Sequence, residues 1–194
     1  MVLTQSSFDY LRTMLGKLTQ DQVNGLNFLV SKMKQAGFTY PEAAYALATV
    51  YVETDKTFQP VGERGSDKYL SKYDTGKLAK QLGNTPEADG DGQLYKGRGY
   101  VQITGRANYK FFSTITGKDL IKNPDLALDK DVAALIMTHG MLNGSFTGVG
   151  FRRKRPVKRY NLYLYTQARN IINGTDRATE IAQHAMVFEK ALRS

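Results

Sequence analysis

The sequence predicts a mainly α, α+β domain in which a small β element accompanies several packed helices. Two observations lead to this class. Several stretches place apolar residues at the spacing of one helix face, whereas only Tyr100–Thr104 alternates bulky and polar residues as a strand does. The chain has 194 residues, of which 41% are hydrophobic and 23% charged, and it contains no linker or repeat. Such a length and composition predict one buried core, so residues 1–194 are expected to form a single domain.

Two helices are expected at the N-terminus. Ser6 or Ser7 is suited to cap the first, which should run to about Leu15. A second should follow Thr19, with a mostly apolar face, and stop at Gly37. Their charged residues are scattered, so both are expected to be packing elements.

A third helix should begin near Pro41, which suits the first turn of a helix. Ala43–Val52 contains no charged residue, and a helix that is apolar nearly all round is buried. Glu53 comes at its end. A carboxyl group on the rim of a buried helix should be partly desolvated, which favours the protonated form that a general acid requires. The alternative is an ordinary solvated glutamate at a helix end.

The rest of the chain is expected to alternate loops and helices. The stretch Gln59–Lys96 is weak in apolar pattern and suits the wall of a substrate cleft. Its run Asn84–Gln93 lacks the ligand order and terminal glutamate of an EF-hand, so a calcium loop is rejected. Asn173-Gly174 should stop a helix and leave the asparagine side chain free to face the cleft. Helices are expected at 76–82, 106–116, 129–142, 162–172 and 176–192.

The stretch Gly97–Tyr109 carries the most specific pattern. Its first glycines suit a tight turn or a close approach of the backbone to a ligand. On a strand over Tyr100–Thr104, Gln102 and Thr104 would share one face, and a following helix would bring Asn108 to the same side. These three residues would form a polar shelf suited to sugar hydroxyls. A polar edge strand followed by a helix explains the spacing equally well.

This stretch resembles the Gly-Arg-Gly-x-Ile-Gln-Leu-Ser/Thr-x-x-x-Asn-Tyr signature of glycoside hydrolase family 19, which includes plant-type chitinases and many phage endolysins. Val52-Glu53-Thr54, Phe58–Glu63 and Asn170–Gly174 agree with further motifs of that family, in the same order. The similarity runs from about Tyr40 to the C-terminus and is nearest to the endolysin branch. It implies a lysozyme-like fold with two helical lobes and a small β element lining the substrate cleft.

The resemblance also implies catalytic roles. Glu53 matches the family's first catalytic glutamate, the general acid, and Glu63 matches a glutamate of the endolysin branch that would be the base. Plant-type enzymes carry their base further along the chain, so three other carboxylates stay open as the base. These are Glu87, Asp89 and Asp91.

Further residues are expected to hold the water and the sugar. Thr104 and Gln102 would hold the attacking water and the neighbouring sugar, and Ala107 stands where plant-type enzymes have tyrosine. The family is inverting, which implies carboxylates about 6.5–9.5 Å apart. No metal or organic cofactor is expected. The full expected substrate-binding set is Gln102, Asn108, Asn173, Arg98 and Tyr100.

The formal charge of +9 predicts attraction to polyanions. The sharpest cluster is the basic run Arg152–Arg159. Through its first four residues, Arg152, Arg153, Lys154 and Arg155, we expect binding to anionic polymers of the cell wall or outer membrane. Anionic lipid as the ligand and an ordinary exposed loop stay open as alternatives. No nucleic-acid partner is expected, and the chain is expected to be a monomer.

Other chemistries are disfavoured by residue content. The chain has no cysteine, and its two histidines, His139 and His184, make a histidine-based metal site improbable. The N-terminus lacks the pattern of a signal peptide and no apolar stretch is long enough to span a membrane. The enzyme is therefore expected to be made in the host cytoplasm and to reach the wall or periplasm after release.

Together these observations predict a peptidoglycan-degrading endolysin that makes a muramidase-type β-1,4 cut. Two alternatives stay open. A chitinase would share the site and differ in substrate, and a non-catalytic glycan- or polyanion-binding domain would need only the polar shelf and the charge.

Overall fold

The computed structural model describes residues 1–153 and 160–194. It is mainly helical with one two-stranded sheet, which confirms the predicted fold class. The chain forms two compact units: unit 1 comprises residues 1–58 and 137–194, and unit 2 comprises residues 59–136. The assignment of residues 1–194 to one catalytic domain stays a prediction. Within the described residues, no helix combines the length and apolar character needed to cross a bilayer.

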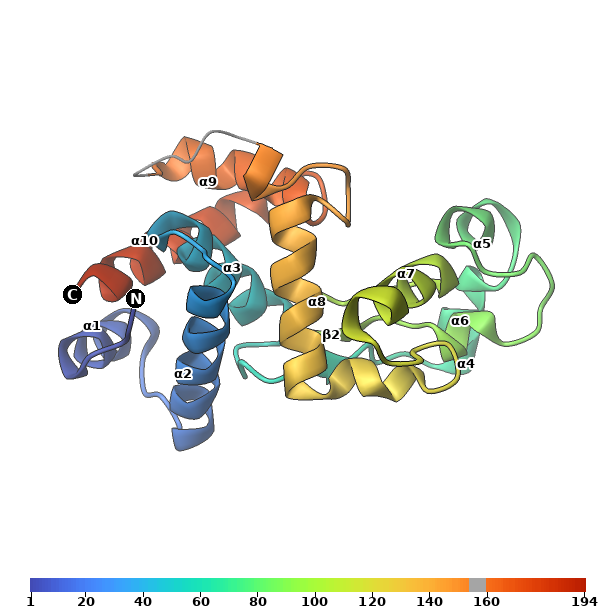
Figure 1. Cartoon of the computed structure of the whole chain (residues 1–194), viewed down its shortest axis with the longest axis horizontal. Helices are drawn as coiled ribbons and strands as arrows, with labels where there is room; N and C mark the ends of the chain where they lie inside the picture. Colours follow the sequence, from blue (N-terminus) through green and yellow to red (C-terminus); the bar gives the residue numbers. More distant parts are fainter. Residues whose placement is uncertain (154–159) are drawn as a thin grey trace. The chain divides into compact units, whose positions relative to one another are not determined.

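Unit 1 is built around helices α3 and α10, which pack against each other along their length (Figure 1). Helices α1 and α9 also contact α10, and α2 contacts α3. The helices of this unit are α1 Gln5–Leu15, α2 Gln20–Gln35, α3 Tyr40–Glu53, the second part of α8 Lys130–Asn143, α9 Leu162–Ala168 and α10 Ala178–Arg193, with 3₁₀ turns η3 Phe151–Arg153 and η4 Arg169–Ile171.

Helix α3 is the buried helix that the sequence predicts. Every residue from Pro41 to Val52 is buried. The Glu42 carboxylate accepts from the N–H of Thr39 at the start of the helix, and Pro41 occupies the first turn, where its missing N–H costs nothing. Because the helix is surrounded by side chains, Glu53 is the point at which it reaches partly exposed surface.

The local sequence pattern predicts the N-terminal caps of the first two helices, one correctly and one not. Thr19 caps α2 as expected, with Gln22 returning the hydrogen bond. The proposed Ser6 or Ser7 cap of α1 is wrong. Thr4 is the cap, because it has the extended backbone of that position and its side chain accepts from the N–H of Ser7.

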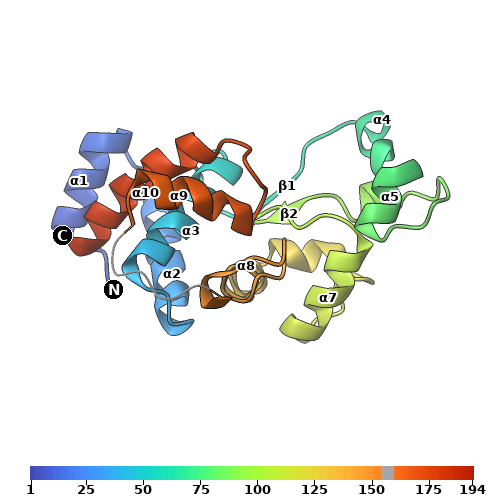
Figure 2. The ribbon, with the colours of Figure 1, turned by 90° about the horizontal axis from the view of Figure 1, so that it is seen from above.

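Unit 2 contains short helices and the sheet (Figure 2). Strands β1 and β2 are antiparallel, and Val61 pairs with Gly99 while Gly62 pairs with Arg98. The elements are β1 Val61–Gly62, α4 Asp67–Leu70, η1 Ser71–Tyr73, α5 Gly76–Leu82, α6 Asp91–Leu94, β2 Arg98–Gly99, α7 Arg106–Thr116, η2 Pro124–Leu128 and the first part of α8.

The predicted strand over Tyr100–Thr104 is wrong. Strand β2 ends at Gly99, and the chain turns back so that the backbones of Arg98 and Ile103 exchange both hydrogen bonds. The turn between them needs left-handed backbone at Gly99 (φ 89°) and at Gln102 (φ 54°). The alternating side chains therefore belong to a tight hairpin.

The later helices lie close to their expected positions. The 76–82 and 106–116 helices are confirmed as α5 and α7, and the expected 129–142 helix is α8. The expected 162–172 helix ends earlier as an α-helix, at Ala168, and continues as one 3₁₀ turn.

Candidate active site

Glu63 continues the pairing of the two strands and is fixed by its neighbours in unit 2. Its N–H donates to the carbonyl of Gly97 at 2.7 Å. Its carboxylate accepts twice, from the Gly97 N–H at 3.0 Å and from the Tyr73 hydroxyl at 3.1 Å. Burial raises the pKa of the Tyr73 hydroxyl, and the charge of Glu63 adds to the rise, so Tyr73 remains a neutral donor near neutral pH. Glu63 is only partly buried, so two donors set its direction and leave lone pairs for a ligand.

Three polar side chains converge on Gly97. A Cβ atom placed there would lie 2.9 Å from Gln102 Oε1, 3.2 Å from Glu63 Oε2 and 3.3 Å from Thr104 Oγ1. A side chain at position 97 would therefore displace all three groups. The sequence predicts a close approach of the glycine backbone to a ligand. In the structure, the groups that closely approach Gly97 are the protein's own carboxylate, amide and hydroxyl.

The polar shelf is thus present, with a different support from the one predicted. Gln102 donates both amide hydrogens, to the carbonyl of Val61 at 2.7 Å and to that of Gly99 at 3.0 Å. Thr104 donates its hydroxyl hydrogen to the carbonyl of Gln102 at 3.0 Å. Asn108 donates to the carbonyl of Thr104 at 2.8 Å. With these hydrogens committed to the backbone, the oxygens of Gln102 and Thr104 are left as acceptors.

Arg98 and Tyr100, also expected to contact substrate, are buried in unit 2. The Arg98 side chain donates to Asp125 at 2.8 Å, to the Tyr109 hydroxyl at 2.9 Å and to the carbonyl of Leu94 at 2.9 Å. Tyr100 is 1% exposed, and burial raises the pKa of its hydroxyl. Their positions favour a supporting role beneath the hairpin.

Two of the alternative base candidates, Glu87 and Asp89, lie in the loop before α6, and the third, Asp91, is its first residue. Asp91 is buried and accepts from the N–H of Thr85 at 3.0 Å. Asp89 accepts from the Thr85 hydroxyl at 2.6 Å, and this hydrogen bond lowers the pKa of Asp89. Glu87 is exposed. Asp89 and Asp91 therefore shape the loop, which favours Glu63 as the base.

In unit 1, Glu53 forms an ion pair with Arg169 of η4. Arg169 Nη2 donates to Glu53 Oε1 at 2.8 Å, and the side chains of arginine and glutamate are 1% and 22% exposed. Arg169 Nε donates to the carbonyl of Asp176 at 2.7 Å, and the Asp176 carboxylate lies 3.7 Å from Nη2. Glu53 is thus partly buried as predicted, and its main neighbour is a buried cation.

The turn that follows Glu53 is strained. Asp55, Lys56 and Phe58 all have positive φ, at 49°, 68° and 55°. Buried Thr54 holds the turn, because its hydroxyl donates to the carbonyl of Val50 at 2.7 Å and accepts from the N–H of Phe58 at 3.1 Å. Such strain concentrates at functional sites, where the surroundings must hold it.

The remaining predicted residues of unit 1 lie at the surface. Asn173 is exposed, and its N–H donates to the carbonyl of Arg169 at 2.9 Å, so it follows the turn that holds the ion-pair arginine. In the basic run, Arg152 is exposed and donates to Asn143 at 3.2 Å. Lys154 and Arg155 lie outside the described residues. The backbone of Arg153 ends η3.

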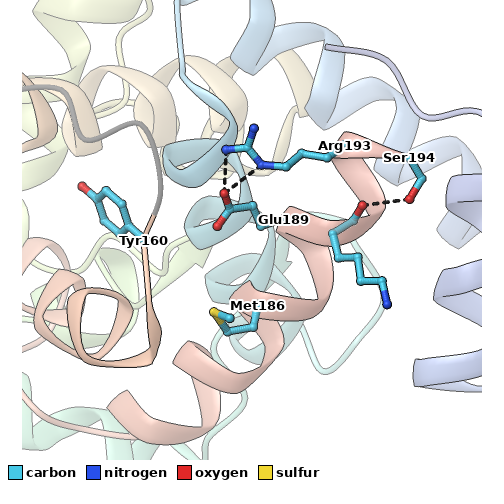
Figure 3. A pocket seen from close by; sticks show the side chains of 6 residues that line it. Tyr160, Met186, Glu189, Arg193 and Ser194 are labelled. Carbon is cyan, nitrogen blue, oxygen red and sulfur yellow. Dashed lines mark hydrogen bonds and ion pairs between the residues drawn. The ribbon is translucent and has the colours of Figure 1, made fainter.

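A cavity of about 430 Å³ lies elsewhere in unit 1, near the C-terminal end of α10 (Figure 3). Its ionisable groups are already paired: Glu189 accepts from two nitrogens of Arg193 and from the buried Tyr165 hydroxyl. Lys190 Nζ lies 4.7 Å from the centre of the Tyr10 ring. This cavity brings together no pair of carboxylates suited to glycosidic chemistry.

Within the described part of the chain, no three His, Cys, Asp or Glu side chains gather as metal ligands would. The expectation that no cofactor is needed stays a prediction.

Burial lowers the pKa of His139, and the charge of Arg152 lowers it further.

Comparisons with known proteins agree with the family resemblance. No family model matches the chain. Over 55 residues it is 46% identical to a glycosyl hydrolase family 19 domain-containing protein of Haemophilus influenzae, a stretch that covers 28% of this chain and 27% of that protein. The chain therefore matches about a quarter of that relative's length.

Solved structures extend the similarity to the fold. Chitinase C of Streptomyces griseus matches with a TM-score of 0.60 and 20% identity over 99% of this chain and 77% of its own. A bacterial family 19 chitinase matches with a TM-score of 0.57 and 18% identity over 97% of this chain and 95% of its own. The family 19, chitinase-like resemblance is confirmed.

Sequence reasoning missed two supporting residues. Arg169 directly precedes the Asn170–Gly174 motif, and a lone basic residue at the end of a helix was the available signal. Tyr73 lies in a stretch without apolar periodicity, and nothing local marks its contact with Glu63 ten residues earlier.

Proposed function

The chain is similar in sequence and in fold to family 19 glycoside hydrolases, and we propose that it is itself a glycoside hydrolase that cuts β-1,4 bonds in the glycan strands of peptidoglycan. The observation that carries this proposal is the gathering of the Glu63 carboxylate, the Gln102 amide and the Thr104 hydroxyl around Gly97. A carboxylate beside a hydroxyl that can only accept is suited to hold and deprotonate a water molecule.

Glu63 acts as the general base. Its two donors, the Gly97 N–H and the Tyr73 hydroxyl, are neutral, so they orient the carboxylate without cancelling its charge. The Thr104 oxygen accepts one hydrogen of the water while Glu63 takes the other. The water attacks the anomeric carbon directly, so the product has the inverted configuration.

Glu53 acts as the general acid. It gives its proton to the leaving oxygen and becomes a carboxylate. Arg169, 2.8 Å away and itself buried, stabilises that carboxylate. Asn173, Asn108 and Gln102 bind the sugars. No metal or organic cofactor takes part.

Peptidoglycan is favoured over chitin by charge. The chain carries +9, and the basic run would hold anionic wall or outer-membrane polymers. Position 107 holds Ala, where the plant-type pattern has Tyr. We place the enzyme among phage endolysins, made in the host cytoplasm and acting as a monomer on the wall during lysis. Chitin hydrolysis is the second candidate, because both structural relatives above are chitinases.

The test is mass spectrometry of products from purified peptidoglycan, run beside release of soluble oligosaccharides from chitin. Reducing-end muramic acid is expected. Products with reducing-end glucosamine would mean a glucosaminidase, and products with an anhydro sugar would mean a lytic transglycosylase. Release of oligosaccharides from chitin but not from peptidoglycan would mean a chitinase.

Two variants test the catalytic roles. Glu53→Gln and Glu63→Gln should each lower turnover at least about a hundredfold. Because Glu53→Gln removes the charge facing buried Arg169, its fold must be checked by circular dichroism and melting temperature. Substantial activity in either folded variant would refute the assignment of that residue.

A further inference from the structure

One stripe of helix α3 carries three polar side chains. Tyr45, Thr49 and Glu53 are spaced by four residues, so they follow one another along the same face of the helix. Tyr45 and Thr49 are completely buried, and Glu53 is at the partly exposed end. A polar stripe inside an otherwise apolar helix is costly unless its groups find partners.

Arg169 lies against this stripe from η4. Its Nη2 holds Glu53 and its Nε holds the carbonyl of Asp176, whereas its Nη1 is buried with no hydrogen-bond partner among the described residues. Tyr45 Oη and Thr49 Oγ1 are buried without a partner in the same sense. Burial raises the pKa of Tyr45, and the nearby side chains of Thr49 and Arg169 lower it, so the three atoms share one neighbourhood.

These atoms have the chemistry of an internal water site. Nη1 can only donate, and each hydroxyl can donate and accept, so one water can bond to all three. Buried waters typically make about three hydrogen bonds, to polar groups that otherwise have none.

We propose that Tyr45 and Thr49 hold an internal water against Nη1 of Arg169, and that they thereby act as positioning residues for the Glu53 carboxyl. Glu53 alternates between its neutral and charged forms if it is the general acid, a role that rests on the proposed function. Asp176, whose side chain is 64% exposed, competes for the same Nη2. A neutral anchor on Nη1 keeps the guanidinium in place in both forms of Glu53.

The anchor does not titrate in the working range, because burial raises the pKa of Tyr45 to about 12. The charged and titratable groups around Glu53 and its partner Arg169 include Arg177, Asp176 and Tyr45.

The first test needs no activity. A high-resolution crystal structure of the whole chain should show a water about 2.7–3.2 Å from all three atoms. The water should be absent, or its contact to Nη1 lost, in a structure of Tyr45→Phe. A dry site in the wild-type protein would overturn the proposal.

The second test uses Tyr45→Phe and Thr49→Val, which remove one hydroxyl each and keep the shape. Each should lower kcat about tenfold on soluble peptidoglycan fragments, leave KM nearly unchanged and shift the basic limb of the rate profile, which the general acid sets. The matched control is Tyr165→Phe, which removes another buried tyrosine hydroxyl of unit 1 and should lower the melting temperature without changing kcat. Wild-type kcat and pH profile in both folded variants would overturn the positioning role. An inactive wild-type protein with an ordered water would instead refute the proposed function alone.

Discussion

Gly97→Ala adds a single methyl group at the point where the three side chains of the candidate base site meet. The new Cβ would lie 2.9 Å from Gln102 Oε1, 3.2 Å from Glu63 Oε2 and 3.3 Å from Thr104 Oγ1, whereas ordinary contacts begin near 3.4 Å. Gln102 must therefore move by about 0.5 Å, and the other two by a few tenths of an ångström or less. Backbone strain is not involved, because the φ angle of Gly97 is not positive.

These displacements set the expected size of the effect. A misplacement of 1 Å can cost about a hundredfold in rate, so half of that distance should cost about tenfold in kcat, or about 1.4 kcal/mol. Crowding of partly exposed side chains should cost about 1 kcal/mol of stability, the low end for overpacking. For a chain of this length that corresponds to a melting temperature lower by about 2–4 °C.

The assay measures kcat and KM on soluble glycan fragments together with the melting temperature. Gly62→Ala is the matched control, because it lies in β1 beside the site and a Cβ there meets nothing within 4 Å. The control should keep full activity. Wild-type kcat in Gly97→Ala, or equal losses in the two variants, would refute the geometry argued for Gly97.

Three further predictions concern the same chemistry and its surroundings. Thr104→Val should lower kcat at least about a hundredfold with little change in KM, and Thr104→Ser should keep much of the activity. NMR of fresh digests of the wild-type enzyme should show a product with the inverted anomeric configuration. A product that first appears with the substrate's own configuration would mean double displacement. Asp91→Asn should be mild in kinetic assays, because an amide oxygen still accepts from Thr85, and a crippling loss would transfer the base to this loop. Replacing Arg152, Arg153, Lys154 and Arg155 by glutamate should weaken binding to walls, measured by sedimentation, most strongly at low salt. The turnover of soluble glycan fragments should barely change. An equal loss on both substrates would place the run in the catalytic site.

The sequence predicts best where one local feature decides the structure. The charge-free run of α3 allows only a buried helix, and Pro41 marks its start, so both are confirmed. Glu53 then follows as the residue at its rim. The family motifs also predict the convergence of Glu63, Gln102 and Thr104, which no spacing argument alone establishes.

Prediction fails where backbone conformation or distant contacts decide. Alternation over five residues is shared by a short strand and a tight hairpin, and the left-handed φ of Gln102, which makes the hairpin, has no signal in its side chain. Arg169 lies 116 residues after Glu53, so their ion pair leaves no trace in any local pattern. Tyr73 is a similar case at shorter range.

The surroundings of the two glutamates suit different steps of one reaction. Glu63 is held by two neutral donors, so its negative charge stays available to draw a proton from water. Glu53 faces a buried guanidinium, which stabilises the carboxylate that remains after a proton has been given away. A base beside Arg169 would have its charge offset before it could act, and an acid held only by Tyr73 and Gly97 would leave behind a carboxylate that faces two neutral donors. The two environments thus match the proposed roles, release of the proton by Glu53 and its uptake by Glu63.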